Sequence, residues 1–271
     1  MPRRVDQRFL PMASAAEMTR SLRRHWPHYL VEATGSAIFL AVSSTAAVVF
    51  RHPNSAVAQA LGPSELVQRT GLALVMGGLV MAMAYSPWGQ RSGAHFNPAV
   101  TLGFWQLSHI RTADALWYVL FQFAGALAAG FAMFHLLQPW FGYPAIHYNV
   151  TRPIDSDYGW LWALGAETSI SGVFMLLLLR ALHSARFKDR VGVLAGIMLA
   201  VFIVAEAPVS GMSLNPARSM GTAVAAGLAP ALWVYFAGPL LAMWGTAALF
   251  GRYRGRKPLA ERPPVYPNAA A

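Results

Sequence analysis

The sequence lacks cysteine altogether and carries little charge, although it is rich in apolar residues. Of its 271 residues none is Cys, 12% are charged and 56% are hydrophobic. The absence of cysteine excludes disulfides, thiolate metal sites and a cysteine nucleophile. The charged fraction is about half of the roughly 25% found in ordinary soluble domains, so water alone does not suit this chain as a solvent.

The net charge is +10, from 21 Lys and Arg residues against 11 Asp and Glu residues, but the cations do not form one stripe. Many of them precede the first long apolar run or follow the last one: Arg3, Arg4, Arg8, Arg20, Arg23, Arg24, Arg252, Arg254, Arg256, Lys257 and Arg262. Nucleic-acid binding would gather cations on one face, whereas basic flanks are typical of a membrane protein. The pattern therefore indicates membrane orientation rather than a nucleic-acid partner.

Six apolar stretches are long enough to cross a bilayer, which takes about 20 residues of helix. We expect spans near residues 28–50, 70–85, 113–137, 158–182, 191–207 and 229–250. Two more helical patterns, 98–106 and 216–226, are too short to cross and predict re-entrant half-helices. With both termini in the cytoplasm, most cations fall on the cytoplasmic side, as the positive-inside rule requires. The sequence thus predicts an all-α membrane protein.

One segment of the chain occurs twice. The sequence SGAHFNPA at 92–99 recurs as SGMSLNPA at 210–217, and Glu32 early in the first span matches Glu167 early in the fourth. Each half then has three spans and one half-helix, and because three is odd the second half is inverted. The predicted layout is a tail over 1–25, a first repeat over 26–137, an outside connection over 138–157, a second repeat over 158–250 and a tail over 251–271.

The Asn-Pro pairs in these segments are helix starts. Asparagine is a favoured N-cap, and proline suits the first helical position because its missing N–H would be unsatisfied there. Two such starts meeting near the midplane would bring two positive helix ends together, which repels cations. The Asn97 and Asn215 amides could also donate hydrogen bonds to a passing oxygen. A water oriented in this way would break a proton wire.

The segments SGAHFNPAVTLG and SGMSLNPARS make the chain resemble the aquaporin, or major intrinsic protein, family over about residues 26–251. The resemblance implies an aquaporin-like right-handed bundle of six transmembrane helices and two re-entrant half-helices. It also implies a homotetramer in the plasma or inner membrane that needs no cofactor or metal, with the lipid bilayer, water and small neutral solutes as partners. Its pore motifs would be Asn97, Pro98, Ala99, Asn215, Pro216 and Ala217.

The resemblance also assigns a selectivity filter. Arg218 is then the constriction arginine, and its partners are Gly77, Ile203 and Met212. Strict water channels of the family usually carry an aromatic residue and a histidine at the first two of these partner positions. Glycine and isoleucine would make the filter wider and more apolar, although Gly77 could instead serve close helix packing and Met212 could fill the gap. The mixed pattern resembles a nodulin-like or aquaglyceroporin-like branch.

Other residues support the pore by resemblance. Glu32 and Glu167 would accept hydrogen bonds from backbone N–H groups of the re-entrant loops, and His95 would line the cytoplasmic half of the pore. Glu206 departs from the family pattern: it could pair with Arg218, place negative charge in the outer vestibule, or reach outward to solvent. The remaining loop positions expected to line or support the pore are Gly93, Ala94, Gly211 and Ser213.

The function expected from these features is a passive channel for water and small neutral solutes such as glycerol, urea or metalloid acids, excluding protons and ions, and not an enzyme. One alternative is a strict water channel in which Met212 fills the filter. Another is a coupled secondary transporter, because inverted repeats and broken helices also build transporters. Its candidate relay groups are scattered over both halves: Glu206, His95, Glu32, Glu167 and His135.

Overall fold

The computed structural model describes residues 13–254, which are almost entirely helical and contain no strand. Six of its helices are long and apolar enough to cross a membrane, as predicted. They are α1 (Ala15–Arg51), α3 (Glu65–Tyr85), α6 (Thr112–Leu136), α7 (Gly159–Leu182), α8 (Val191–Ser210) and α10 (Val234–Arg254). The half-helices α5 (Pro98–Gln106) and α9 (Pro216–Ala226) have the predicted bounds, because each begins at an Asn-Pro pair.

Shorter elements fill the connections. These are α2 (Ala56–Leu61), α4 (Pro87–Ser92) and the 3₁₀ turns η1 (Trp140–Gly142), η2 (His147–Asn149) and η3 (Lys188–Arg190). Helices α2 and α4 were not predicted. Helix α4 has a local cause: Ser86 accepts a hydrogen bond from the Gly89 N–H at 3.0 Å, Pro87 occupies the first turn, and Gly93 ends the helix at φ +82°.

Helix α1 begins earlier than expected, so part of the predicted tail over 1–25 is helical. Ser14 and Glu17 form a capping box, in which the Ser14 N–H donates to Glu17 Oε2 at 2.7 Å and the Glu17 N–H donates to Ser14 Oγ at 3.3 Å. The helix then continues through Pro27 into the first span. The remainder of the two predicted tails, 1–12 and 255–271, lies outside the described residues.

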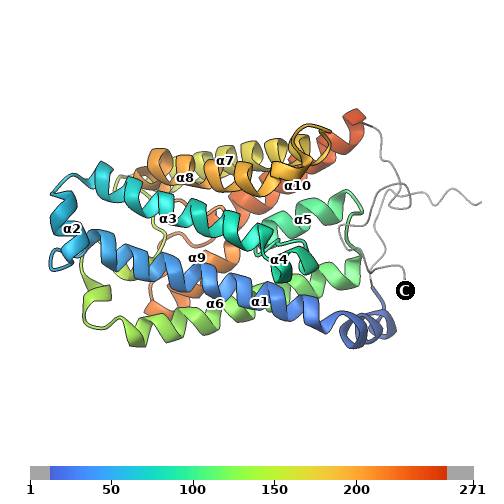
Figure 1. Ribbon diagram of the computed structural model, residues 1–271, viewed down its shortest axis with the longest axis horizontal. Coiled ribbons are helices and arrows are strands. Elements are labelled where there is room, and N and C mark those ends of the chain that lie inside the picture. The colour runs from blue at the N-terminus through green and yellow to red at the C-terminus, as the bar shows by residue number, and fades with distance from the viewer. Residues whose placement is uncertain (1–12, 255–271) are drawn as a thin grey trace, which may run out of the picture.

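The two described chain ends lie at the same end of the bundle, as an even number of spans requires (Figure 1). Helix α1 packs against α6 in the first half and α7 against α10 in the second, while α3 packs against α8 across the halves. At Gly125 on α6, an added Cβ would meet the backbone of Ala33 on α1, so this pair approaches closely. Each half-helix packs on the last span of the opposite half, α5 on α10 and α9 on α6.

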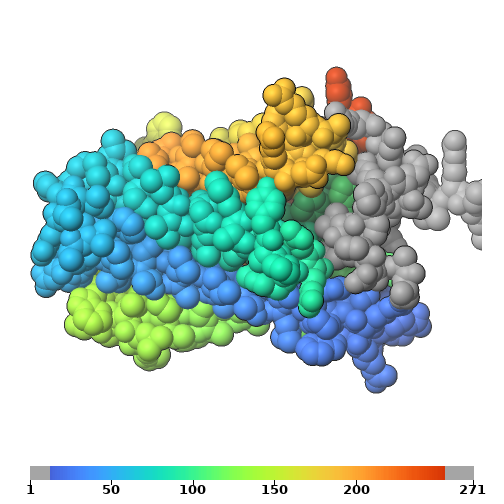
Figure 2. Space-filling view, in the orientation of Figure 1, coloured from blue at the N-terminus to red at the C-terminus, as the bar shows by residue number. Residues whose placement is uncertain are grey.

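The outer surface of the bundle is apolar. Figure 2 shows α1, α3 and α8 as blue, cyan and orange bands side by side along one face. Large apolar side chains on the spans point outward, among them Leu74, Val201, Leu241 and Leu249. Several polar side chains are instead buried inside, including Glu32 and Glu167. An apolar exterior that encloses buried polar groups suits hydrocarbon as the surrounding solvent.

Candidate functional site

The starts of the two half-helices are capped by the asparagines of the repeated segment. Asn97 Oδ1 accepts a hydrogen bond from the Ala99 N–H at 2.9 Å. Asn215 Oδ1 accepts from the Ala217 N–H at 3.0 Å and from the Arg218 N–H at 3.3 Å. Both asparagines have extended backbone, and proline follows in the first turn of each helix. Local chemistry alone therefore fixes where α5 and α9 begin.

The same two asparagines join the half-helices to each other. Asn97 Nδ2 donates to the Leu214 carbonyl at 2.8 Å, and Asn215 Nδ2 donates to the Phe96 carbonyl at 2.9 Å. The tips therefore touch in the middle of the bundle. Because a side-chain amide carries two N–H groups, each asparagine keeps one donor for a further acceptor. The positive ends of two helices also face this point.

The loops before the asparagines have matching backbone. Each contains a glycine at the end of the preceding helix and two further residues in the left-handed region, where a non-glycine residue costs about 1–3 kcal/mol. In the first loop these are Gly93 (φ +82°), Ala94 (+52°) and Phe96 (+46°), and in the second Gly211 (+79°), Met212 (+49°) and Leu214 (+59°). Such conformations persist only where the surroundings hold them.

Glu32 on α1 holds the first loop. Its Oε1 accepts hydrogen bonds from Ser92 Oγ at 2.6 Å and the His95 N–H at 3.1 Å. Its Oε2 accepts from the Phe96 N–H at 2.6 Å and from Gln122 Nε2 at 2.7 Å. The carboxylate is fully buried, and its donors belong to the last residue of α4, to the loop and to α6. Its contacts are those of a scaffold for the strained loop.

Glu167 on α7 holds the second loop in the same way with three donors. Its Oε1 accepts from Ser210 Oγ and from the Ser213 N–H, both at 2.7 Å, and its Oε2 accepts from the Leu214 N–H at 2.9 Å. Glu32 and Glu167 are thus each bonded to the loop of their own half, so both have the contacts of loop anchors.

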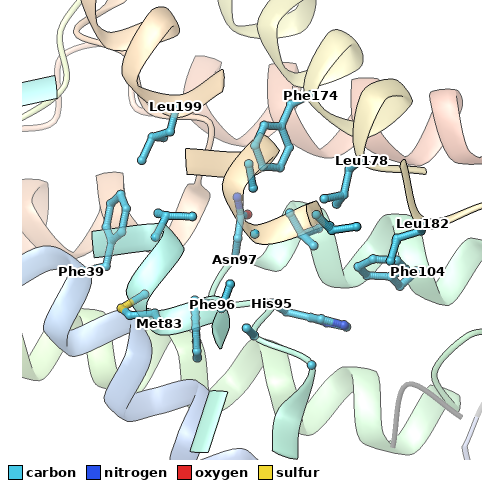
Figure 3. A pocket seen from close by; sticks show the side chains of 18 of the residues that line it. Phe39, Met83, His95, Phe96, Asn97, Phe104, Phe174, Leu178, Leu182 and Leu199 are labelled. Atoms are coloured by element: carbon cyan, nitrogen blue, oxygen red, sulfur yellow. The ribbon is translucent and has the colours of Figure 1, made fainter. Parts of the chain in front are cut away.

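Two cavities meet at the touching tips. The inner cavity, on the side of the described chain ends, has about 700 Å³ and is lined by residues from Lys188 to Asn97 and Asn215. Figure 3 shows Asn97 among the side chains that line it. The outer cavity, at the opposite end, has about 90 Å³. Phe39, Leu199 and Ser213 line both cavities, so they mark the place where the cavities adjoin.

His95 lies on the wall of the inner cavity, as expected of a lining residue (Figure 3). Its ring stacks on Phe104 with centroids 4.8 Å apart, and its Nδ1 lies 3.1 Å from Thr101 Oγ1. Gly93 and Ala94 line the same cavity, whereas Gly211 and Met212 line the outer one. The structure thus brings the candidate loop residues together around one axis.

The expected filter position at Gly77 requires a correction. A Cβ at Gly77 would lie 2.6 Å from the Gly196 carbonyl oxygen and 3.1 Å from Ala200 Cβ, so this glycine faces α8. The neighbouring Met76 lines the outer cavity together with Ile203, Met212 and Arg218. Counting back from Asn97 assumes a connection of fixed length, and one residue turns a helical side chain by about 100°. The helix-packing interpretation of Gly77 is therefore the one that the geometry supports.

Arg218 points into the outer cavity and is held by a residue that the sequence did not reveal. Its Nη2 donates to Asn149 Oδ1 at 3.0 Å, while its Nη1 is buried without a hydrogen-bond partner in the described part of the chain. Asn149 Nδ2 in turn donates to Ser43 Oγ at 3.0 Å. Asn149 stands in a loop turn with φ +56°, and no local pattern signals that this loop folds into the vestibule.

Glu206 occupies none of the three expected places. It is 7% exposed, so it does not reach outward, and it does not line the outer cavity. Within residues 13–254 it forms no ion pair with Arg218, and its carboxyl group interacts with Ser210 at the end of α8. Its carboxyl group also interacts electrostatically with that of Glu167. We therefore do not place Glu206 in the outer vestibule.

The fold and the site define an integral membrane protein in which two inverted half-helices meet between two cavities. Residues 18–250 match the family model for the major intrinsic proteins, and the chain belongs to this family, which comprises membrane channels rather than enzymes. Aquaporin NIP2-3 of Zea mays is 30% identical over 234 residues, covering 86% of this chain and 71% of that protein. Aquaporin NIP1-1 of Zea mays is 34% identical, covering 70% of this chain and 66% of that protein.

A further relative is aquaporin NIP1-3 of Oryza sativa subsp. japonica, and the chain spans 65% of its length. The chain thus covers about two thirds of the length of the relatives that it matches. Among solved structures, that of the aquaglyceroporin from Plasmodium falciparum matches with a TM-score of 0.64 and 18% identity. The match covers 84% of this chain and 94% of that one. At this identity the likeness concerns the fold alone, and it agrees with the predicted aquaporin-like bundle.

Proposed function

We propose that the protein is a passive channel for water and small neutral solutes. The observation that carries this proposal is the contact between the capped tips of α5 and α9 at the place where the two cavities adjoin. Backbone at the middle of a membrane is tolerated only where protein buries it or where it lines a water-filled passage. A passage along this axis would lead from one aqueous compartment to the other.

Proton and cation exclusion follows from the same contact. One N–H of each asparagine is fixed on the opposite loop, so the remaining N–H has a defined direction toward the axis. A water accepting from Asn97 and Asn215 would have to point its own protons away from the centre, which interrupts a proton wire. The two positive helix ends add a barrier to cations.

The solute filter that we propose consists of Met76, Ile203, Met212 and Arg218. Three of these side chains are apolar and one is a hydrogen-bond donor, so the ring is amphipathic. It suits water and slender solutes that present an alkyl edge on one side and hydroxyl groups on the other, such as glycerol. Met76 occupies the space that a glycine would have left open, which narrows the filter relative to the sequence-based expectation.

The position in the cell and the assembly are parts of the same proposal. We place both termini in the cytoplasm, because most cations then lie on the cytoplasmic side. The inner cavity would accordingly open to the cytoplasm. We assign residues 26–137 and 158–250 to the two repeats, joined outside by 138–157. A homotetramer in the plasma or inner membrane, with one pore per subunit and no cofactor, completes the proposal.

Stopped-flow light scattering on proteoliposomes tests the channel. Relative to empty liposomes, we expect faster shrinkage in sucrose and reswelling in glycerol, while an enclosed pH dye reports no added proton leak. Leu199→Trp is a matched blocked variant, because Leu199 lines both cavities, and gel filtration verifies its folding. Shrinkage no faster than in empty liposomes would refute the channel. A solute flux that saturates and stops with the proton gradient would favour the transporter.

A further inference from the structure

Three arginines from distant parts of the chain line the small outer cavity. Arg51 is the last residue of α1, Arg69 belongs to the second turn of α3, and Arg218 belongs to the first turn of α9. The filter arrangement accounts for Arg218 but leaves Arg51 and Arg69 without a role. Both are half-buried at the rim of a cavity of about 90 Å³.

The positive charge of this cavity is not balanced by carboxylates. Arg69 Nε donates to the Val204 carbonyl at 3.0 Å, and Arg218 Nη2 donates to the Asn149 amide oxygen at 3.0 Å, so both partners are neutral. The Arg51 guanidinium makes no hydrogen bond to the described residues, and Arg218 Nη1 is buried without a partner. No carboxylate in residues 13–254 lies within 4.0 Å of these guanidinium groups.

Glu167 interacts electrostatically with Arg218, but its carboxylate accepts hydrogen bonds from the second loop and does not line the cavity. A second opposing charge is Glu65, at the start of α3. The negative charge of Glu65 attracts the Arg51 guanidinium, whereas the positive charges of Arg69 and Arg152 repel it. Glu65 is exposed and does not line the cavity. The outer cavity therefore keeps an excess of positive charge together with several N–H donors that have no acceptor.

The chemistry and size of this cavity select a class of ligand. Guanidinium groups bind carboxylates and oxyanions through charge-assisted, often bidentate hydrogen bonds. A cavity of about 90 Å³ suits a small oxyanion such as formate, acetate or bicarbonate better than a sugar phosphate. The side of the cavity formed by Leu72, Met76 and Ile146 is apolar and would accept a short alkyl group.

We propose that Arg51, Arg69 and Arg218 form a binding site for a small monovalent oxyanion, such as a short-chain carboxylate, in the outer cavity. The bound anion lies directly outside the filter and slows the passage of water. The binding itself is independent of transport, whereas this effect on flux rests on the proposed channel function.

Saturation-transfer NMR on the full-length protein in detergent micelles tests binding, with acetate as the probe. Gluconate, whose chain is too long for the cavity, keeps the ionic strength constant, and acetamide serves as the neutral isostere. We expect a transfer signal from acetate and none from acetamide. In Arg51→Gln and in Arg69→Gln the affinity for acetate should fall about tenfold, the loss of one charge-assisted contact.

Two variants distinguish direct contact between an arginine and the anion from the electrostatic effect of nearby charges that do not line the cavity. Arg152→Gln removes a nearby charge that does not line the cavity and should leave the affinity within about twofold. Glu65→Gln removes the opposing charge and should raise the affinity. Arg51→Gln is the cleanest substitution because Arg51 makes no hydrogen bond that the fold needs. An acetate signal unchanged in both Arg51→Gln and Arg69→Gln, or equal to that of acetamide, would overturn the site.

Water flux distinguishes this proposal from the channel itself. With acetate equal on both sides of proteoliposomes before the osmotic step, wild type should shrink more slowly than in gluconate, and Arg51→Gln should lose this inhibition. Wild-type protein that binds acetate but conducts no water would refute the channel and leave the site. Water conduction without acetate binding would refute the site and leave the channel.

Discussion

The two halves of the molecule share the backbone conformation of their loops but carry different side chains at the two ends of the axis. Ala94 and Met212 both stand three residues before the asparagine, and Val100 and Arg218 stand three residues after it. Gly77 and Gly196 face each other across α3 and α8, so Met76 corresponds to Ala195, and Ile203 corresponds to Ala84. Each filter residue of the outer cavity thus has a small or apolar counterpart in the lining of the inner cavity.

This difference explains the unequal size of the cavities. Two methionines, an isoleucine and an arginine narrow the outer end to about 90 Å³, whereas three alanines and a valine leave about 700 Å³ at the inner end. The loops and their carboxylate anchors stay alike, because both ends need the strained backbone that presents the asparagines. The shared parts therefore determine the fold, and the side chains that differ determine selectivity.

The largest effect should come from Glu32 and Glu167, the carboxylates that hold the two loops. They differ in the number of donors from which they accept hydrogen bonds. Each oxygen of Glu32 accepts two hydrogen bonds, and Glu32→Gln replaces one of these oxygens by an NH2 group, a donor that faces donors. The substitution should lower the free energy of unfolding by about 3 kcal/mol. Glu167→Gln should lower it by about 2 kcal/mol, because Oε2 of Glu167 accepts only one bond. Unfolding in mixed micelles followed by circular dichroism measures both, with the exposed Glu65→Gln as the control.

The second prediction concerns Arg218, which differs most from its counterpart in the other half, Val100. Arg218→Val copies Val100 into the outer loop and should raise glycerol permeability about tenfold, a change of roughly 1.4 kcal/mol, while weakening proton exclusion. Asn149→Ala, which frees the Arg218 side chain, should act in the same direction but less strongly. Stopped-flow reswelling and an enclosed pH dye report the two properties. Unchanged glycerol entry in Arg218→Val would show that the constriction lies elsewhere.

The third prediction distinguishes the roles of the neighbouring residues Met76 and Gly77. Met76→Ala copies Ala195 into the outer cavity and should raise the ratio of glycerol to water permeability several-fold. Because Met76 is also part of the apolar core, the substitution should lower the free energy of unfolding by about 2–5 kcal/mol. Gly77→Ala should also lower the free energy of unfolding, by about 1–3 kcal/mol, since its Cβ would press on the Gly196 carbonyl. If Gly77→Ala altered solute selectivity without loss of stability, the glycine would belong to the filter after all.

The smallest effect tests how alike the two loops are. Ser92 Oγ donates to Glu32 and accepts from the Ala94 N–H, and Ser210 Oγ donates to Glu167 and accepts from the Met212 N–H. Ser92→Ala and Ser210→Ala should each lower the free energy of unfolding by about 1–2 kcal/mol, and the two decreases should be equal. The same unfolding assay compares them. A difference above about 1 kcal/mol would show that the halves are not equivalent even in their shared parts.

Much of this architecture is local and therefore legible in the sequence. The spans follow from runs of apolar residues, and the half-helices begin at Pro98 and Pro216 because Asn-Pro sets the cap and the first φ angle without help from the rest of the fold. The pairing of Glu32 with one loop and Glu167 with the other was expected from the family resemblance and matches the contacts of both carboxylates. The start of α1 could also have been read from the Ser14 and Glu17 capping box.

By itself, then, the sequence determined the helices, the inverted repeat and the positions of the helix starts, because each depends on residues close together in the chain. Only the tertiary structure decided that Met76 rather than Gly77 borders the outer cavity, that Glu206 is buried away from Arg218, and that Arg51 and Arg69 converge on the same space. These facts depend on the rotation of each helix about its axis and on contacts between residues far apart in sequence. Such rotations are set by the packing of neighbouring helices, which no local pattern records.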